Sequence, residues 1–161
     1  MTDLAAAVIE TLARRGWTLG VAESLTGGAV IAELVSVPGA SSVVLGGVVA
    51  YATPIKHTLL GVDESLLGRE GPVHPEVARQ MARGVRRAVG VDGVDASVGV
   101  ATTGIAGPVS PDGQPVGTVH IAVATPERVE AGSFLFPGDR NRIRSASVRA
   151  ALEMLREMSR E

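Results

Sequence analysis

Apolar residues recur along this chain at two spacings, one typical of amphipathic helices and one of buried strands. The helical spacing predicts helices over residues 4–15, 26–35, 54–60, 75–89 and 139–158, with a helical turn near 64–67. Short apolar runs bounded by turn residues predict strands over residues 17–22, 42–51, 96–101, 115–124 and 129–136. The run over 42–51 is apolar on both sides, which predicts a strand covered on both faces.

The connections between these elements predict how the strands are arranged. Helices join the first strand to the second and the second to the third, which permits parallel pairing through right-handed crossovers. Loops without helices join the third, fourth and fifth strands, so the fourth strand should be antiparallel to its neighbours. We therefore expect an α/β fold of three layers, α/β/α, around a mixed five-stranded sheet. The 161 residues contain no repeat or linker, so we expect a single domain over residues 1–161.

The composition narrows the function classes. Apolar residues make up 45% and charged residues 20% of the chain, which argues against disorder. The net charge of −2 and the aromatic fraction of 2% argue against a nucleic-acid partner. The absence of cysteine excludes a disulfide scaffold and cysteine catalysis. The longest nearly apolar run, residues 43–52, is too short to cross a membrane, and no signal peptide is recognisable, so we expect a cytoplasmic protein.

The basic residues are distributed very unevenly between lysine and arginine. Of 15 basic residues, Lys56 is the one lysine, and the one tyrosine, Tyr51, lies shortly before it. Arginine stays protonated in proteins, whereas a desolvated lysine can lose its proton. Lys56 is therefore a candidate for acid–base chemistry, and the alternative is that an arginine-rich composition left one lysine by chance.

The first candidate motif is Ala22-Glu23-Ser24-Leu25-Thr26-Gly27-Gly28. It follows a predicted buried strand and precedes a helix, which places Ser24 at the carboxyl end of a strand, where open α/β sheets bind ligands. Free N–H groups near Gly27 and Gly28 can hold an oxyanion or a phosphate. In the alternative interpretation, Ser24 or Thr26 only caps the helix. Glu23 should point to the opposite face of the strand and have a structural role.

The second motif, Tyr51-Ala52-Thr53-Pro54-Ile55-Lys56, lies at the exit of the next strand. Lys56 falls near the start of a helix, where the positive end of the helix dipole lowers the pKa of an amine. Burial by Ile55, Leu59 and Leu60 should lower this pKa further. A neutral Lys56 can activate the Ser24 hydroxyl, and Tyr51 can position the amine or relay a proton.

The third motif is the glycine-rich loop at residues 101–108, after the third strand. Thr103, Gly104 and Gly107 can contact a polar ligand there, or they can simply build the turn. The glycine spacing fits neither a Walker loop nor a dinucleotide fingerprint. The three histidines show no zinc-like spacing, so we expect no metal site.

The fourth motif, residues 138–144, begins the last helix, with Asp139 as a candidate N-cap. A cation at a helix N-terminus opposes the helix dipole unless an anion binds there too. Arg140 is therefore a candidate phosphate ligand, whereas Arg142 is interpreted as surface charge.

Together these segments resemble the C-terminal domain of the CinA family, which also occurs as free-standing nicotinamide-nucleotide amidases. The resemblance runs from Trp17 to the last helix and rests on segments 22–28, 51–56, 60–62, 103–108 and 115–119, and on Gly138-Asp139-Arg140 with Arg144. Three features differ from many members of that family. Leu25 replaces a cysteine, Ala52-Thr53 replaces Ser-Asn after Tyr51, and the loop over residues 109–114 is longer.

The residues alone predict a Ser–Lys acyl-transfer site beside a glycine-rich edge of the sheet. Ser24, Lys56 and Tyr51 are the candidate catalytic residues, and the candidate substrate contacts are Thr26, Gly27, Gly28, Thr103, Gly104, Gly107 and Arg140. The resemblance adds the substrate: it implies hydrolysis of nicotinamide mononucleotide to nicotinic acid mononucleotide and ammonia, in pyridine nucleotide salvage. It also implies a homodimer, and we expect no cofactor. Two alternatives stay open, a non-catalytic nucleotide-binding regulatory module and a serine amidase for another small amide.

Overall fold

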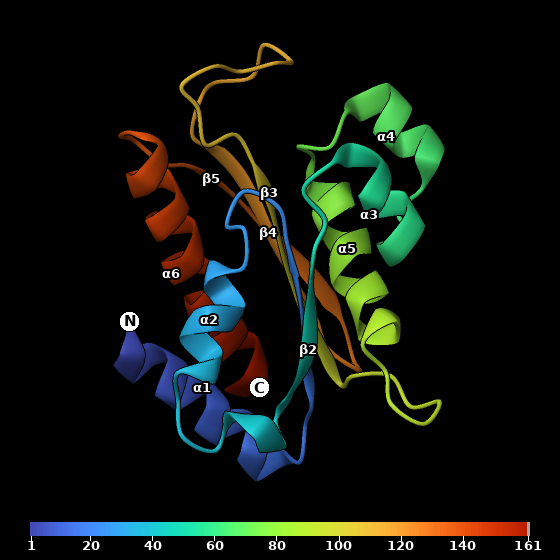
Figure 1. The fold of residues 1–161 in the computed structure, drawn as a ribbon, viewed down its shortest axis with the longest axis vertical. Coiled ribbons are helices and arrows are strands. Elements are labelled where there is room, and N and C mark those ends of the chain that lie inside the picture. Colours follow the sequence, from blue (N-terminus) through green and yellow to red (C-terminus); the bar gives the residue numbers. More distant parts are fainter. Residues whose placement is uncertain (161) are drawn as a thin grey trace.

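The computed structural model, which describes residues 1–160, contains helices and strands in mixed order along the chain and closes with a long helix (Figure 1). The helices are α1 (Thr2–Arg15), α2 (Ala29–Val35), α3 (Thr53–Leu60), α4 (Glu64–Glu70), α5 (Pro75–Ala88) and α6 (Arg140–Arg160), and a 3-10 turn covers Ala40–Ser42. The strands are β1 (Leu19–Glu23), β2 (Val44–Val49), β3 (Val98–Gly104), β4 (Thr118–Ala124) and β5 (Val129–Leu135). Every predicted helix and strand is present, with ends that differ by a few residues. The predicted turn near residues 64–67 is longer than expected and forms α4.

The sheet has the strand order β2-β1-β3-β4-β5. β1 lies between β2 and β3 and is parallel to both. β4 is antiparallel to β3 and to β5. The prediction of a mixed five-stranded sheet with an antiparallel fourth strand is therefore confirmed. Because β1, β2 and β3 are parallel, their carboxyl ends lie at the same edge of the sheet.

The expectation that the second strand is covered on both faces is wrong. β2 is an edge strand, and its residues alternate between half-buried and exposed, with Leu45 and Val49 in solvent. The strands buried along nearly their whole length are β1, β3 and β4, the three inner strands of the sheet. The run was misleading because Gly46 and Gly47 extend an apolar stretch without contributing side chains that need burial.

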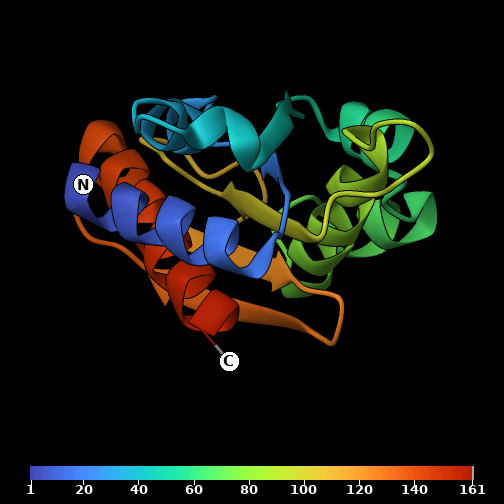
Figure 2. The same ribbon diagram turned by 90° about the horizontal axis from the view of Figure 1, so that it is seen from below.

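Helices cover both faces of the sheet, which gives the expected three layers (Figures 1 and 2). One apolar core, to which Leu19 and Val21 of β1 contribute, lies between the sheet and α1, α2 and α6. The other lies between the sheet and α3, α4 and α5, where the sheet contributes small residues such as Ala22 and Ala101. Within residues 1–160, no helix combines the length and the hydropathy needed to span a bilayer.

The alternation of side chains along β1 decides what its last residues face. Val21 points to the core under α2, and Ala22 points to the core under α5. Glu23 lies two residues after Val21, on the same face, and accepts hydrogen bonds from the backbone of α2. Ser24 lies two residues after Ala22 and hydrogen-bonds to Lys56 of α3. The prediction that Glu23 and Ser24 point to opposite faces is therefore confirmed.

Helix α3 is held against α5 by a close approach at Gly84. A Cβ atom on residue 84 would overlap the backbone carbonyl of Leu60, the last residue of α3. Glycine is therefore needed here for the space it leaves. Because Lys56 lies one helical turn before Leu60, this contact also fixes the depth at which Lys56 enters the sheet edge.

We expect Gly84→Ala to destabilise the protein by about 1–3 kcal/mol, the usual cost of forcing an extra group into a packed contact. The overlap outweighs the gain in helix propensity, which is about 1 kcal/mol for glycine to alanine. Gly68→Ala in α4 is the matched control, because nothing lies within 4 Å of a Cβ atom there. Urea unfolding should show lower stability for Gly84→Ala and equal or higher stability for Gly68→Ala. Equal stabilities of Gly84→Ala and wild type would contradict this account of α3.

Candidate active site

Three chain segments leave the sheet at the edge formed by the carboxyl ends of its parallel strands. Ser24 directly follows β1, β2 leads into α3 with Lys56, and β3 ends at Gly104. The connection from β1 to β2 runs over one face of the sheet and the connection from β2 to β3 over the other (Figure 1). A change of this kind opens a crevice at the carboxyl edge of an α/β sheet, where ligands bind.

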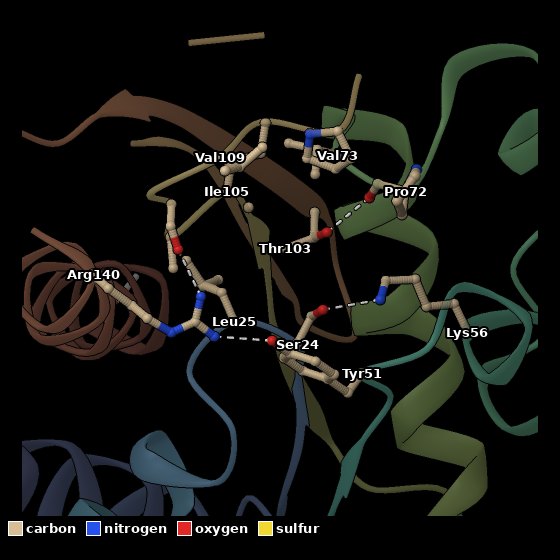
Figure 3. Close-up of a pocket in the computed structure, with 14 residues that line it drawn as sticks. Ser24, Leu25, Tyr51, Lys56, Pro72, Val73, Thr103, Ile105, Val109 and Arg140 are labelled. Atoms are coloured by element: carbon tan, nitrogen blue, oxygen red, sulfur yellow. Dashed lines mark hydrogen bonds between the residues drawn. The ribbon is translucent and has the colours of Figure 1, made fainter. Parts of the chain in front are cut away.

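Ser24 and Lys56 face each other inside this crevice (Figure 3). The Lys56 Nζ atom lies 2.9 Å from Ser24 Oγ and 2.6 Å from the carbonyl oxygen of Ala50. Lys56 is 1% exposed and Ser24 is 8% exposed. The N–H of Ala50 donates to the carbonyl of Glu23, so the pairing of the β1 and β2 segments also fixes the groups that hold the amine.

Burial lowers the pKa of the Lys56 amine from 10.5 to about 8. The cause is desolvation, which penalises the charged form. A neutral Lys56 can accept the Ser24 proton on its lone pair while an N–H donates to Ala50. Of the neighbours expected to bury Lys56, Leu60 is buried and Ile55 is half-buried, but Leu59 is exposed.

The start of α2 is already occupied, which corrects the binding role expected of Gly27 and Gly28. The Glu23 carboxylate accepts three N–H bonds there, from Gly28 at 3.0 Å, from Val30 at 3.1 Å and from Ile31 at 2.9 Å. The N–H of Gly27 donates to the carbonyl of Ser24. Both glycines have positive φ angles, 62° and 99°, so they serve the turn. Their N–H groups are engaged within the chain, and neither residue lines the pocket.

Thr26 holds the loop after Ser24 against β3 and, like the two glycines, does not line the pocket. Its hydroxyl is fully buried and lies 2.8 Å from the hydroxyl of Thr102. The same Thr102 oxygen accepts from the N–H of Ser24 at 3.5 Å. No side-chain hydroxyl caps α2, so the interpretation of Ser24 or Thr26 as a simple cap is wrong.

The opposite side of the pocket is formed by the loop after β3 and by the start of α6. Thr103, Gly104 and Gly107 line the pocket as expected, and the Thr103 hydroxyl donates to the carbonyl of Pro72 at 2.7 Å. Arg140 donates from Nη1 to the carbonyl of Gly107 at 2.8 Å (Figure 3). The predicted cap is also present, since an Asp139 carboxylate oxygen accepts the N–H of Arg142.

Tyr51 stands at the rim of the pocket with 60% of its surface exposed. Its hydroxyl accepts a hydrogen bond from Arg140 Nη2 at 3.0 Å (Figure 3). The expectation that Tyr51 positions the Lys56 amine is corrected by this pairing, because the Ala50 carbonyl has that position. Tyr51 instead orients Arg140 at the mouth of the site.

The pocket between the Ser–Lys pair and Arg140 has a volume of about 230 Å³. Its walls are mostly apolar and include Leu25, Pro72, Val73, Ile105 and Val109. Whole ligand pockets usually measure about 300–1,000 Å³, so this one fits the reacting end of a substrate whose remainder lies along the open rim. Val109 and Pro111 bring the loop over 109–114 to that rim. Sequence reasoning missed the wall at Pro72 and Val73 because neither carries a reactive group.

The histidines are engaged elsewhere. The Nδ1 atom of His57 lies 2.8 Å from the carbonyl of Val62, and that of His74 accepts the N–H of Glu76. His120 pairs with the hydroxyl of Ser133. Across residues 1–160, no three histidine, aspartate or glutamate side chains are grouped so that they could hold a metal ion.

The sequence profile of the CinA C-terminal domain matches residues 1–159. The chain belongs to this family. A CinA-like protein of Frankia casuarinae is 47% identical over 156 residues, which is 97% of this CinA-family chain and 35% of the relative. A CinA-like protein of an Anaeromyxobacter species is 48% identical over 157 residues, or 96% of the chain and 37% of the relative. The chain thus spans about a third of the length of these relatives.

Solved structures of CinA proteins share the whole architecture. The competence/damage inducible protein CihA from Agrobacterium tumefaciens superposes with a TM-score of 0.91 at 35% identity, and the match covers 99% of this chain and 95% of that protein. A CinA superfamily protein from Klebsiella pneumoniae gives a TM-score of 0.91 at 30% identity, with 98% and 96% covered. The three-layer fold with its mixed sheet is therefore the CinA fold.

We expect the reactivity of Ser24 to follow the protonation of Lys56. The rate of labelling by a serine-directed fluorophosphonate should rise with pH to a plateau, with a midpoint near the pKa of about 8, because only the neutral amine can take the hydroxyl proton. Lys56→Arg should lower the plateau by about 10²-fold or more, since arginine stays protonated. Mass spectrometry of the labelled peptide measures the labelling rate at each pH, for wild type and for Lys56→Arg. A flat pH profile, or normal labelling of Lys56→Arg, would rule out Lys56 as the base.

Proposed function

We propose that this CinA-family protein is an amidohydrolase that converts nicotinamide mononucleotide to nicotinic acid mononucleotide and ammonia. The observation that carries the proposal is the buried hydrogen bond between Lys56 Nζ and Ser24 Oγ, 2.9 Å long, with the pKa of the amine lowered to about 8. A serine activated by a neutral amine is suited to acyl transfer from a carboxamide.

In the first half of the reaction, Ser24 Oγ attacks the carboxamide carbon and its proton passes to Lys56. The tetrahedral intermediate collapses, Lys56 donates the proton to the leaving nitrogen, and ammonia departs from an acyl-enzyme on Ser24. In the second half, water gives a proton to Lys56 and attacks the ester carbon. Ser24 leaves as the alcohol after Lys56 returns the proton, so one amide and one water yield one acid and one ammonia.

The shape of the pocket supports a nucleotide with a flat ring. The apolar wall of Leu25, Val73 and Ile105 suits an aromatic ring whose carboxamide faces Ser24. Arg140 lies at the rim, where the rest of the substrate must pass, and its guanidinium has N–H groups beyond the two that bond to Gly107 and Tyr51. A phosphate in that place would be bound by a fixed, oriented cation.

Ser24→Ala should abolish ammonia release, because within residues 1–160 no other hydroxyl is hydrogen-bonded to Lys56, and should leave mononucleotide binding intact. Ammonia release is measured by a coupled assay and binding by calorimetry. Ser41→Ala, at an exposed serine outside the pocket, is the control and should behave as wild type. Continued ammonia release from Ser24→Ala would place the nucleophile elsewhere.

The substrate is tested by comparing the mononucleotide, the riboside, free nicotinamide and unrelated small amides in competition. We expect the mononucleotide to be strongly preferred. Arg140→Ala should weaken the mononucleotide by about tenfold or more, the scale of a lost charge-assisted hydrogen bond, and leave the riboside almost unchanged. Equal hydrolysis of mononucleotide and riboside by wild type would favour an amidase for another amide. Binding without any ammonia release would instead favour a regulatory nucleotide-binding module.

A further inference from the structure

A second arginine of α6 contacts the backbone immediately after the nucleophile. Arg144 Nε donates to the carbonyl of Leu25 at 2.9 Å, and Arg144 Nη2 donates to the carbonyl of Thr26 at 3.0 Å. These contacts join segments 118 and 119 residues apart in the chain. Among residues 1–160, no carboxylate forms an ion pair with Arg144, so the backbone of the Ser24 loop is its binding partner.

Side chains from three elements hold the loop after Ser24. Two of them belong to the inner strands β1 and β3, and the third, Arg144, belongs to α6. Glu23 binds the N–H groups at the start of α2, and Thr102 accepts the N–H of Ser24. Arg144 binds the carbonyl oxygens of the two residues that follow Ser24. Within the loop, the Ser24 carbonyl also accepts the N–H of Gly27, and the Thr26 carbonyl also accepts the N–H of Ala29. Among residues 1–160, the Leu25 carbonyl has the Arg144 guanidinium as its one hydrogen-bond donor, so the orientation of the peptide plane between Leu25 and Thr26 depends on Arg144.

The orientation of these peptide planes matters for the chemistry. In residues 1–160, the N–H of Leu25 has no hydrogen-bond acceptor, and Leu25 lines the pocket. The N–H of the residue after a nucleophilic serine is a common donor to the oxyanion of a tetrahedral intermediate. A cation on the carbonyls of residues 25 and 26 keeps this part of the backbone in one conformation and adds positive potential beside the nucleophile.

We propose that Arg144 is a positioning residue, which acts through the backbone of Leu25 and Thr26 to hold Ser24 and the adjacent N–H in reactive geometry. The inference deepens the proposed amidase function, and its kinetic measurement rests on that function. A planar guanidinium can donate two N–H bonds in a fixed fork to two carbonyls, whereas a lysine ammonium is a compact point charge whose donors rotate and do not match this fork. Charge alone is therefore not sufficient at this position.

Helix α6 connects this contact to the mouth of the site. Arg140 and Arg144 are four residues apart and so lie on the same face of the helix. Arg140 bonds to Gly107 and Tyr51 at the rim, and Arg144 bonds to the nucleophile loop. A substrate group that binds Arg140 thus contacts the same helical turn that holds Ser24.

The test compares Arg144→Lys and Arg144→Ala with Arg142→Lys and Arg142→Ala. Arg142 is the matched control, because it lies in the same part of α6 and its side chain is exposed. We expect both Arg144 variants to lose about tenfold or more in the rate of fluorophosphonate labelling of Ser24, since a misplaced nucleophile reacts slowly. The pH midpoint should stay near 8, because Lys56 is untouched. Guanidinium ion added to Arg144→Ala should restore part of the rate.

Steady-state kinetics separate positioning from binding. For ammonia release, kcat of the Arg144 variants should fall by the same factor as the labelling rate, while KM stays close to the wild-type value. Normal labelling of both Arg144 variants would overturn the inference. A loss of labelling rate that accompanies a lowered melting temperature and is not rescued by guanidinium would also overturn the inference, because Arg144 would then be merely structural. The inference would likewise be overturned if the fluorophosphonate did not label Ser24 of the wild-type protein at all.

The outcomes also keep the two proposals apart. If wild type labels at Ser24 but releases no ammonia from any amide, the amidase proposal fails. The comparison of labelling rates between the Arg144 and Arg142 variants still decides the role of Arg144 in that case, because the phosphonate reaction needs no substrate.

Discussion

The hydrogen bond between a buried lysine amine and the Ser24 hydroxyl places the strictest demand on this fold. An amine without water around it favours its neutral form, and burial lowers the pKa of the Lys56 amine to about 8, as its proposed role as a base requires. The same lack of water means that every polar contact of the amine must come from the chain, and the Ala50 carbonyl meets this need. Small residues on the sheet and Gly84 on α5 allow the helical layer to lie close enough to bury Lys56.

The two helical layers have different tasks at this site. The layer of α3, α4 and α5 carries Lys56, the proposed base, and excludes water from its amine. The layer of α1, α2 and α6 holds the nucleophile loop, through the bonds of Glu23 to the start of α2 and through Arg144. Ser24, the proposed nucleophile, lies between the layers at the end of β1 and is therefore held by both. An active site divided in this way needs the whole sheet in register before any part of it can work.

The sequence predicted those parts of the site that depend on reactive side chains. Lys56 and Tyr51 stood out because each residue type occurs once, and Ser24 stood out because it follows a buried strand. Arg140 was found because a cation there opposes the helix dipole. The fold class followed from the order of elements, since a helix between two strands permits parallel pairing and a tight turn requires antiparallel pairing.

The errors concerned backbone groups and the exposure of one strand, which leave little trace in a sequence. The N–H groups near Gly27 and Gly28 were expected to be free, but Glu23 and Ser24 take them, and this depends on the path of the loop. The role of the Ala50 carbonyl as acceptor for Lys56 could not be predicted from the sequence, because every residue type has a backbone carbonyl. Hydrophobic periodicity cannot say which strand lies at an edge, so the apolar run over residues 42–51 was expected to be covered on both faces, whereas β2 is partly exposed.

The alternation of side chains along β1 restricts where residues can be inserted into or deleted from the chain. Glu23 and Ser24 need opposite faces of the sheet, so inserting or deleting one residue in β1 would exchange them and bring a carboxylate, in place of the hydroxyl, to Lys56. We therefore expect changes in length to be tolerated only in segments outside the parallel strands. The loop over residues 109–114 is such a segment, because it reaches the pocket from the rim and can gain or lose residues without reversing the direction of any catalytic side chain.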